Sequence, residues 1–325
     1  MPSLVLATAT GLVQCEGGDG GSWEVSHRSL EGRRLTAVIA RQGVILAGTP
    51  DGIWRSDDGG LEWRPASDGL TTRHVRWMAY HPDISDREFV GTEPAAIFVS
   101  HDGGASWRSC PEVAELRDRF EWSLPYSPEA GCVRGFTFLG ARGYAAVEVG
   151  GVLRSDDAGK TWRLVEGSDG KPDLNGPPEP LIYPDVHSIT VHPSSSDLVS
   201  APTGGGFYRS RNGGKAWGLL YDCYCRGCWV DPGDPQRIVL GPADGVDRNG
   251  RVELTVDGGR TWSPTSTGLN APWRKTMVER FAQVGDQLIA VLSNGELFSA
   301  SVSRLEWQRI LPAVQGVAAV AVFAA

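Results

Sequence analysis

The sequence predicts an all-β fold, a seven-bladed β-propeller of four-stranded antiparallel blades, from three observations. Nearly the same eight letters return along the 325 residues, for example as "SDDGGLEW" (56–63) and "SDDAGKTW" (155–162). Short β-rich runs, such as "LTAVIA", "VILAGT" and "IWRS", precede the copies, and another run follows each tryptophan. The spacing of about 40 to 55 residues, with four strands in each unit, is typical of propeller blades.

The recurring stretch, which we call the box, ends in a tryptophan in each unit. Five full boxes and two degenerate ones give the series Trp63, Trp107, Trp162, Trp217, Trp262, Trp23 and Trp307. Glycine permits positive φ in such a turn, and Asp or Asn can bond to the amides of its own turn. We expect the box to join the third and fourth strands and its tryptophan to pack back across the blade, less critically in the degenerate copies.

The boxes resemble the Asp-box or BNR repeat, S/T-x-D-x-G-x-x-W, of sialidases, two-propeller xyloglucanases, sortilin-type receptors and a photosystem II assembly factor. The resemblance covers essentially the whole chain and implies a propeller. It does not imply one function, because that family mixes enzymes with binding proteins. The Arg-Ile-Pro motif of sialidases is absent, and the chain has the length of one propeller rather than two. Both of these enzyme assignments are therefore disfavoured.

The two ends of the sequence predict how the ring closes. The first unit begins with "SLVLATA" and has no earlier strand, whereas "GVAAVAVFAA" near the end is an apolar, uncharged strand with no box after it. Placed innermost in the first blade, strand 316–324 would pair with strand 3–8 and remove an open sheet edge. We therefore expect residues 1–325 to form a single propeller domain and a monomer.

Composition narrows the classes of partner and the location. A formal net charge of −8 argues against nucleic acid and against an anionic membrane surface as main partners. The N-terminal "MPSLVLATATGLVQ" lacks a basic region, and we expect a strand there rather than a signal peptide. No stretch approaches the roughly 18 apolar residues of a membrane helix. A cytoplasmic location with reduced cysteines is the expectation.

One column of cationic or titratable residues is predicted at the entrances of the inner strands. Aligning these strands on "HPD" (81–83), "HPS" (192–194) and "DPG" (231–233), and the others more loosely, gives Arg34, Arg76, Arg134, His187, Arg226 and Arg280. Guanidinium groups around a concave mouth would bind a sugar acid, a phosphorylated compound or an acidic peptide or partner. In the alternative interpretation these residues are structural, with Glu93, Glu148 and Glu279 neutralising the ring.

Long connections are expected to wall one side of this mouth. Residues 108–132 contain "PEVAELRDRF", a short helix that starts at proline, and residues 164–186 are proline-rich extended chain. With 221–229 they carry aromatic residues that could stack on a sugar ring or anchor the loops: Trp122, Tyr126, Tyr183, Tyr224 and Trp229. Tyr183 and Trp229 are our candidates for ligand contact.

The run "CYCRGC" raises the alternative of a metal site. Cys223, Cys225 and Cys228 lie close in sequence, and His187 begins the inner strand of the neighbouring blade, which gives a set suited to zinc or copper. The paired C-x-x-C hairpins of a structural zinc site are missing, and cysteine is often a buried apolar residue. We predict no cofactor.

Two functions from different classes remain open. In the first, the protein is a non-catalytic propeller that binds an anionic ligand or partner at the channel mouth. In the second, it is an enzyme acting on a glycan or small acid, with Glu93, Glu148, Asp185 or Glu279 as acid or base and the arginines holding the substrate carboxylate. Two facing carboxyl groups roughly 5 to 10 Å apart would favour the enzyme. Carboxylates that are each paired to an arginine would favour the binding protein.

Overall fold

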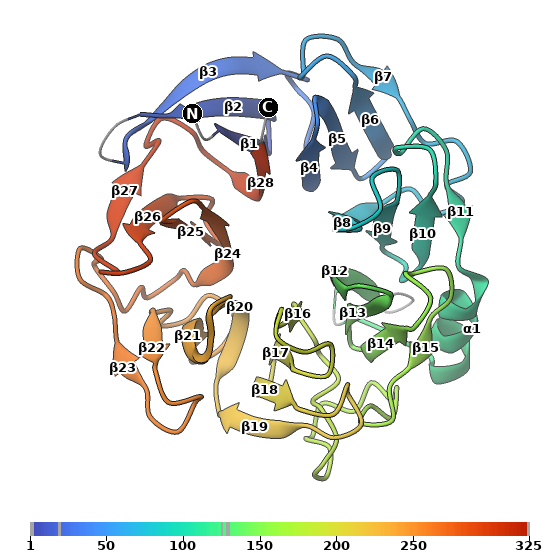
Figure 1. Ribbon diagram of the computed structural model, residues 1–325, viewed down its shortest axis with the longest axis vertical. Coiled ribbons are helices and arrows are strands. Elements are labelled where there is room, and N and C mark those ends of the chain that lie inside the picture. Colours follow the sequence, from blue (N-terminus) through green and yellow to red (C-terminus); the bar gives the residue numbers. More distant parts are fainter. Residues whose placement is uncertain (1–2, 19–20, 125, 128–130, 324–325) are drawn as a thin grey trace.

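The computed structural model describes residues 3–18, 21–124, 126–127 and 131–323. Within these residues, seven four-stranded antiparallel sheets form a ring, as the sequence predicts (Figure 1). The innermost strands face the central axis and the fourth strands lie at the rim. Each sheet is one blade, and we number the blades from the one that holds the N-terminal strands.

The first three blades contain the following strands. In the first blade they are β28 (Val317–Phe323), β1 (Ser3–Thr8), β2 (Gly11–Gly17) and β3 (Trp23–Ser29). In the second they are β4 (Ala37–Arg41), β5 (Val44–Thr49), β6 (Gly52–Ser56) and β7 (Arg64–Pro65). In the third they are β8 (Val75–Tyr80), β9 (Glu88–Thr92), β10 (Ile97–Ser100) and β11 (Arg108–Ser109).

The remaining four blades follow in chain order. The fourth has β12 (Cys132–Leu139), β13 (Arg142–Glu148), β14 (Gly151–Ser155) and β15 (Arg163–Leu164), and the fifth has β16 (Thr190–Val191), β17 (Val199–Thr203), β18 (Gly206–Ser210) and β19 (Gly218–Tyr221). The sixth has β20 (Tyr224–Asp231), β21 (Asp234–Ala243), β22 (Glu253–Thr255) and β23 (Ser263–Pro264), and the seventh has β24 (Val278–Val284), β25 (Gln287–Leu292), β26 (Leu297–Ser301) and β27 (Gln308–Ile310). One helix, α1 (Pro111–Phe120), starts at the predicted proline.

The ring closes in the first blade, as predicted. Strand β28 pairs antiparallel with β1, in a register that sets Leu6 opposite Val320 and Ser3 opposite Phe323. The hydroxyl of Ser3 also donates a 2.8 Å hydrogen bond to the carbonyl of Phe323. The observed strand spans Val317–Phe323, and Ala324 of the predicted range lies outside the described residues.

The box forms the turn between the third and fourth strands through one repeated hydrogen-bond pattern. In the second blade, Ser56 donates to a carboxylate oxygen of Asp58 at 2.7 Å and accepts from the amide of Gly60 at 2.7 Å. The same oxygen of Asp58 accepts from the amides of residues 61 and 62, each at 3.0 Å. Ser155 and Asp157 repeat this pattern in the fourth blade. The aspartates thus satisfy turn amides that would otherwise lack partners.

The box tryptophans pack across their own blade, as expected, and also against the preceding blade. The indole of Trp107 donates 2.9 Å to the carbonyl of Ala66 in the preceding blade, and the ring packs among side chains of the second and third blades. Trp307 repeats this contact with the carbonyl of Thr265 at 2.9 Å. Although the box of Trp307 is degenerate, its side chain is as buried as that of Trp107, since each tryptophan is 3% exposed.

Neighbouring blades bury the middle strands on both faces. In β5 and β25 all residues except the first are buried, so the strands are continuous apolar runs rather than alternating ones. The large core clusters therefore join adjacent blades, as between β5 and β9 in the second and third.

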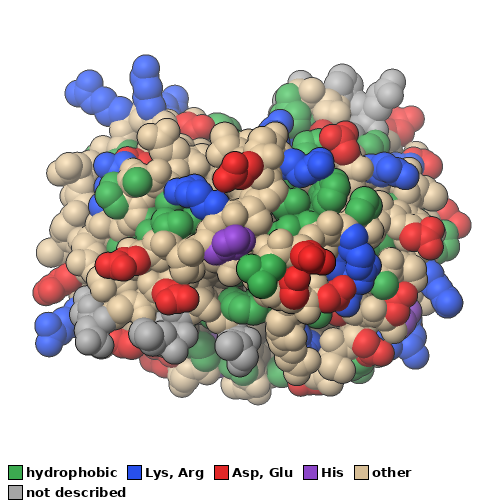
Figure 2. Space-filling view, turned by 90° about the horizontal axis from the view of Figure 1, so that it is seen from above, with side chains coloured by type: hydrophobic (Ala, Val, Ile, Leu, Met, Phe, Trp, Pro, Cys, Tyr) green, Lys and Arg blue, Asp and Glu red, His purple; other side chains and the backbone are tan. Residues whose placement is uncertain are grey.

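The outer wall carries charges of both signs. On the side shown in Figure 2, acidic and basic side chains are interspersed among polar and apolar ones, without a large field of one sign. No helix in the described part of the chain has the length and apolar character required to cross a membrane. Charged side chains also line a cavity of the ring.

Candidate binding site at the mouth of the central channel

A cavity of about 500 Å³ lies at the end of the ring where the inner strands begin. Its lining includes five of the six predicted column residues: Arg34, Arg76, Arg134, Arg226 and Arg280. They converge because each occupies a similar position at the start of an inner strand in a repeated blade. His187, the sixth, is a fully buried side chain close to this lining and touches Asp185 and Tyr224.

Two of the predicted carboxylates are bound by arginines of the column. Arg134 lies 3.3 Å from Glu148 and 3.4 Å from Glu279, and Arg226 donates to the other oxygen of Glu279. Burial alone would raise the pKa of Glu148, but Arg134 and other neighbours more than offset it and lower that pKa to about 2. The pKa of Glu279 is also lowered, since Arg134 and Arg226 outweigh its burial. Both groups are held ionised.

The third glutamate is paired in the same way. A guanidinium nitrogen of Arg76 lies 2.6 Å from a carboxylate oxygen of Glu93. His74 lies 3.9 Å from that same oxygen and also lines the cavity. The arginines of the column and the glutamates predicted to neutralise them are therefore both present. Their pairing determines which arginines remain available to bind a ligand.

Two arginines of the cavity have no ion-pair partner among the residues that the structure describes. Arg34 is exposed, whereas the guanidinium of Arg280 lies 4.4 Å over the ring of Trp77, and its Nε has no hydrogen-bond partner. Burial lowers the pKa of Arg280 to about 10, despite the opposing effect of nearby Glu279. This guanidinium still carries its positive charge at neutral pH.

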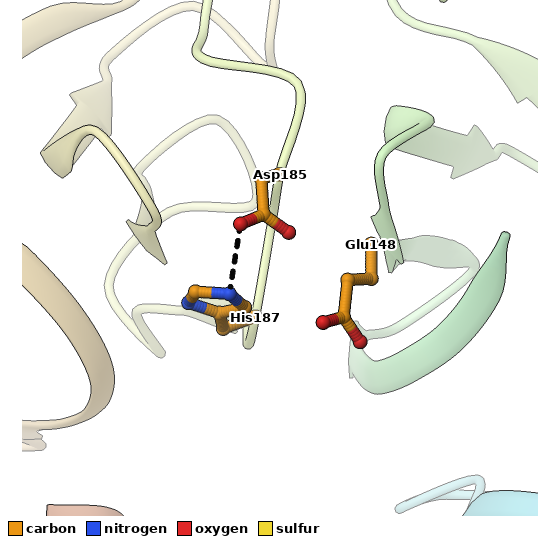
Figure 3. Close-up of side chains that lie close together, drawn as sticks. All are labelled: Glu148, Asp185 and His187. Atoms are coloured by element: carbon orange, nitrogen blue, oxygen red, sulfur yellow. Dashed lines mark ion pairs between the residues drawn. The ribbon is translucent and has the colours of Figure 1, made fainter. Parts of the chain in front are cut away.

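His187 belongs to a buried polar cluster beside the cavity. Its Nδ1 donates 2.8 Å to the carbonyl of Cys225, and its Nε2 faces a carboxylate oxygen of Asp185 at 3.2 Å and the hydroxyl of Tyr224 at 3.3 Å. Figure 3 shows Asp185 and His187 on one segment, with Glu148 facing them from another. One potential ligand atom from each of these three lies within 4.8 Å of the others, the only such group in the described part of the chain.

The predicted cysteine set is not brought together with His187. Cys223, Cys225 and Cys228 are free thiols. Burial raises the pKa of Cys228 to about 12 and that of Cys225 well above its usual value, so both stay protonated at neutral pH. Among the described residues, the one group of potential metal ligands that lie close together does not include these cysteines.

Of the predicted aromatic residues, Tyr126 lines the cavity and is 60% exposed. Tyr183 donates to the carbonyl of Leu174 at 2.8 Å within its own loop. Trp229 is buried, and its indole donates 2.9 Å to Gln283 of the seventh blade. Neither Tyr183 nor Trp229 is part of the cavity lining.

Several residues of the cavity were not among the predictions. Trp77, which supports Arg280, follows Arg76 on β8, and His74 precedes that strand. Asn294 comes from the turn between β25 and β26. Sequence offered only a weak signal for them, because aromatic and polar residues are common in such strands and turns.

Comparisons with known proteins are limited to structure. No protein-family model matches this sequence, and no curated protein matches it either. Among solved structures, an ancestral GH74 enzyme is 17% identical with a TM-score of 0.63 over 91% of this chain, which spans only 37% of that enzyme. YCF48 bound to D1 peptide is 16% identical with a TM-score of 0.61, covering 91% of this chain and 87% of that one.

A second YCF48 structure, from Cyanidioschyzon merolae, is 13% identical with a TM-score of 0.61 and covers 93% of this chain and 96% of that one. Identities this low indicate a common fold and not a common activity. The chain is a seven-bladed β-propeller, similar in structure to propellers of GH74 enzymes and of YCF48.

Proposed function

We propose that this propeller is a binding protein whose channel mouth takes a ligand or partner through an anionic group. The observation that carries the proposal is the pair Arg34 and Arg280, which line the cavity without an ion-pair partner among the described residues. A guanidinium presents a planar fork that matches a carboxylate or phosphate, and a concave site strengthens its field.

The enzyme alternative has weaker support. Oxygens of Glu148 and Asp185 approach within 4.8 Å of each other, but only Glu148 lines the cavity. The pKa of Glu148 is about 2, because Arg134 and other neighbours outweigh its burial. A general acid at neutral pH needs a raised pKa instead. Glu93 and Glu279 are each paired to an arginine, which favours binding over hydrolysis.

Two finer assignments belong with this proposal. We assign the boxes to the Asp-box repeat, supported by the shared Ser–Asp–amide hydrogen bonds of the turns. A protein partner is one source of the anionic group, and the solved YCF48 propeller bound to D1 peptide is a precedent for peptide binding by this fold.

The test is a thermal-shift screen with citrate, glucuronate and phosphate at matched ionic strength, with glycerol as the uncharged comparison. An anion that binds the native protein raises its melting temperature. The double variant Arg34→Ala and Arg280→Ala removes this rise, since each lost charged hydrogen bond weakens binding by about 1.5 to 3 kcal/mol.

Arg64→Ala is the matched control, because Arg64 is a half-exposed arginine in the rim strand β7, paired with Asp57 at 2.6 Å. It leaves the anion-induced rise unchanged. The proposal is overturned if none of the three anions raises the melting temperature, or if the rise persists in the double variant.

A further inference from the structure

A second cavity continues from the first along the channel. It measures about 220 Å³, and apart from Tyr80 and Arg280 the residues that line it have apolar side chains: Ala37, Val38, Ile39, Ala40, Trp77, Met78, Ala319, Val320, Ala321 and Val322. Trp77 and Arg280 line both cavities. The first cavity touches residues just before β4 and the start of β28, and the second touches the rest of these strands. Arg280 therefore stands at the junction between a polar mouth and an apolar inner section.

Strand β28 contributes apolar residues to this inner section. All seven of its residues are apolar, yet five of them are not fully buried. Val322 is 37% exposed and lines the second cavity. Apolar surface left exposed to water is unfavourable. Together with the neighbouring guanidinium of Arg280, this surface is complementary to a molecule that has an apolar part and an anionic part.

The dimensions suit a small molecule. An apolar cavity of about 150 Å³ suffices for benzene, so about 220 Å³ accommodates a larger hydrocarbon group. The apolar wall follows four residues of β4, or about 13 Å at the usual rise per residue.

The charges of the mouth favour a head group with a single negative charge. Arg280 and Arg34 attract an anion, but Glu148 and Glu279 line the same cavity and repel additional negative charge. A carboxylate satisfies the guanidinium fork of Arg280 with one charge.

We infer that the ligand is an amphipathic carboxylate, with the carboxylate on Arg280 and an apolar tail in the cavity between β4, β8 and β28. This inference rests on the proposed function, because it names the class of anion that the mouth takes. The tail buries the exposed part of β28, and the carboxylate completes the hydrogen bonding of the Arg280 guanidinium.

Isothermal titration with acetate, butanoate, hexanoate and octanoate, all below micelle formation and at one ionic strength, tests this inference. Each methylene added to the tail tightens binding about fourfold. Octan-1-ol, which has the tail without the charge, binds more weakly than octanoate. Arg280→Met removes most of the octanoate affinity and keeps a side chain of similar length beside Trp77.

Val322→Phe fills the apolar cavity, so it abolishes the advantage of octanoate over acetate and leaves acetate binding in place. Ala40→Phe, on the opposite strand, gives the same result if the first variant folds poorly. Val246→Phe, at a 59% exposed valine outside both cavities, is the matched control and changes nothing.

Equal affinities along the series, with binding still dependent on Arg280, overturn the apolar tail and leave the proposed function standing. Octanol binding as tightly as octanoate overturns the carboxylate. If the polar anions of the earlier screen bind but octanoate does not, the inference alone fails, and if no anion binds at all, both proposals fail.

Discussion

Arg134 shows how single residues at the channel mouth hold one another in place. Its guanidinium lies between Glu148 and Glu279, which come from the fourth and seventh blades, so one side chain bridges opposite parts of the ring. Removing one partner of a buried ion pair leaves an uncompensated charge, which costs more than the pair contributes. Arg134 therefore has the bracing role that the sequence left open for the column.

The lowered pKa of Glu148 makes stability depend on acid pH. Its folded-state pKa of about 2 lies below the usual 4.5, so its contribution is present above pH 4.5 and lost as the pH falls toward 2. This contribution is on the order of 3 kcal/mol. Denaturant unfolding at a series of pH values between 6 and 2 measures it.

In that series Glu148→Gln loses less stability between pH 4.5 and 2 than the unaltered protein does, because it has no carboxylate there to protonate. Glu31→Gln, at an exposed position, serves as the control and follows the unaltered protein. Parallel curves for Glu148→Gln and the unaltered protein would contradict the lowered pKa.

For single residues, the sequence predicted which arginines line the mouth better than it predicted which groups they pair with. The arginines could be aligned because each occupies the same place in a repeated unit. Which of them remains unpaired depends on side-chain contacts across the ring, such as Arg226 with Glu279, and no repeat encodes these. The stacking of Arg280 on Trp77 likewise joins the seventh blade to the third.

Among the elements, the box turn places a tryptophan against the preceding blade. The turn itself follows from local chemistry, since Ser56 and Asp58 satisfy nearby amides. The direction of the tryptophan does not follow from local chemistry. The ring of Trp107 packs against both its own blade and the preceding one, and its indole bond to the carbonyl of Ala66 ties it to the preceding blade.

Tryptophan replacements should rank by burial and not by how well the box matches its consensus. Trp107→Ala and Trp307→Ala each lower the free energy of unfolding by about 3 to 5 kcal/mol, since both are buried and both lose an indole bond to the preceding blade. Trp63→Ala costs less, because Trp63 is only partly buried although its box is a full copy. Denaturant unfolding gives the three values.

If Trp307→Ala lowered the free energy of unfolding less than Trp63→Ala, the match of the box to its consensus, and not burial, would set the contribution of the tryptophan to stability. The tryptophans are the appropriate probe because the other large residues of these clusters vary from blade to blade, whereas the box places one indole at the same point of each repeat.

For the whole molecule, the sequence predicted the number of blades and the closing strand correctly. The period of the boxes fixed the blade count, and the unpaired apolar run near the end identified β28. The long loops were less predictable. Trp122 anchors one of them through a 2.7 Å indole bond to the carbonyl of Gly170, and of their aromatic candidates Tyr126 is the one found in the cavity lining. Loop paths depend on such distant contacts, which no periodic pattern records.

Deleting residues 314–325 removes β28 and exposes the inner edge of β1, so the protein aggregates and melts at a lower temperature. Size-exclusion chromatography and thermal unfolding detect both effects. Ser3→Ala, which removes one side-chain bond to β28 and keeps the strand, remains monomeric. A soluble, monomeric truncation with unchanged melting would show that the closure contributes little.

The pairing of β1 with β28 also sets the order of events during synthesis. Ser3 and Phe323 are 320 positions apart, and at about 5 to 20 residues per second a ribosome needs roughly 15 to 60 s to make the intervening chain. Throughout that time the first blade lacks its innermost strand, and β1 presents an unpaired apolar edge to the cell. The box turns depend only on contacts between residues close in sequence, so each can form as soon as it has been synthesised. The most distant contact forms last, so the nascent chain depends on chaperones or on rapid folding of the later blades to keep that edge from pairing with another chain.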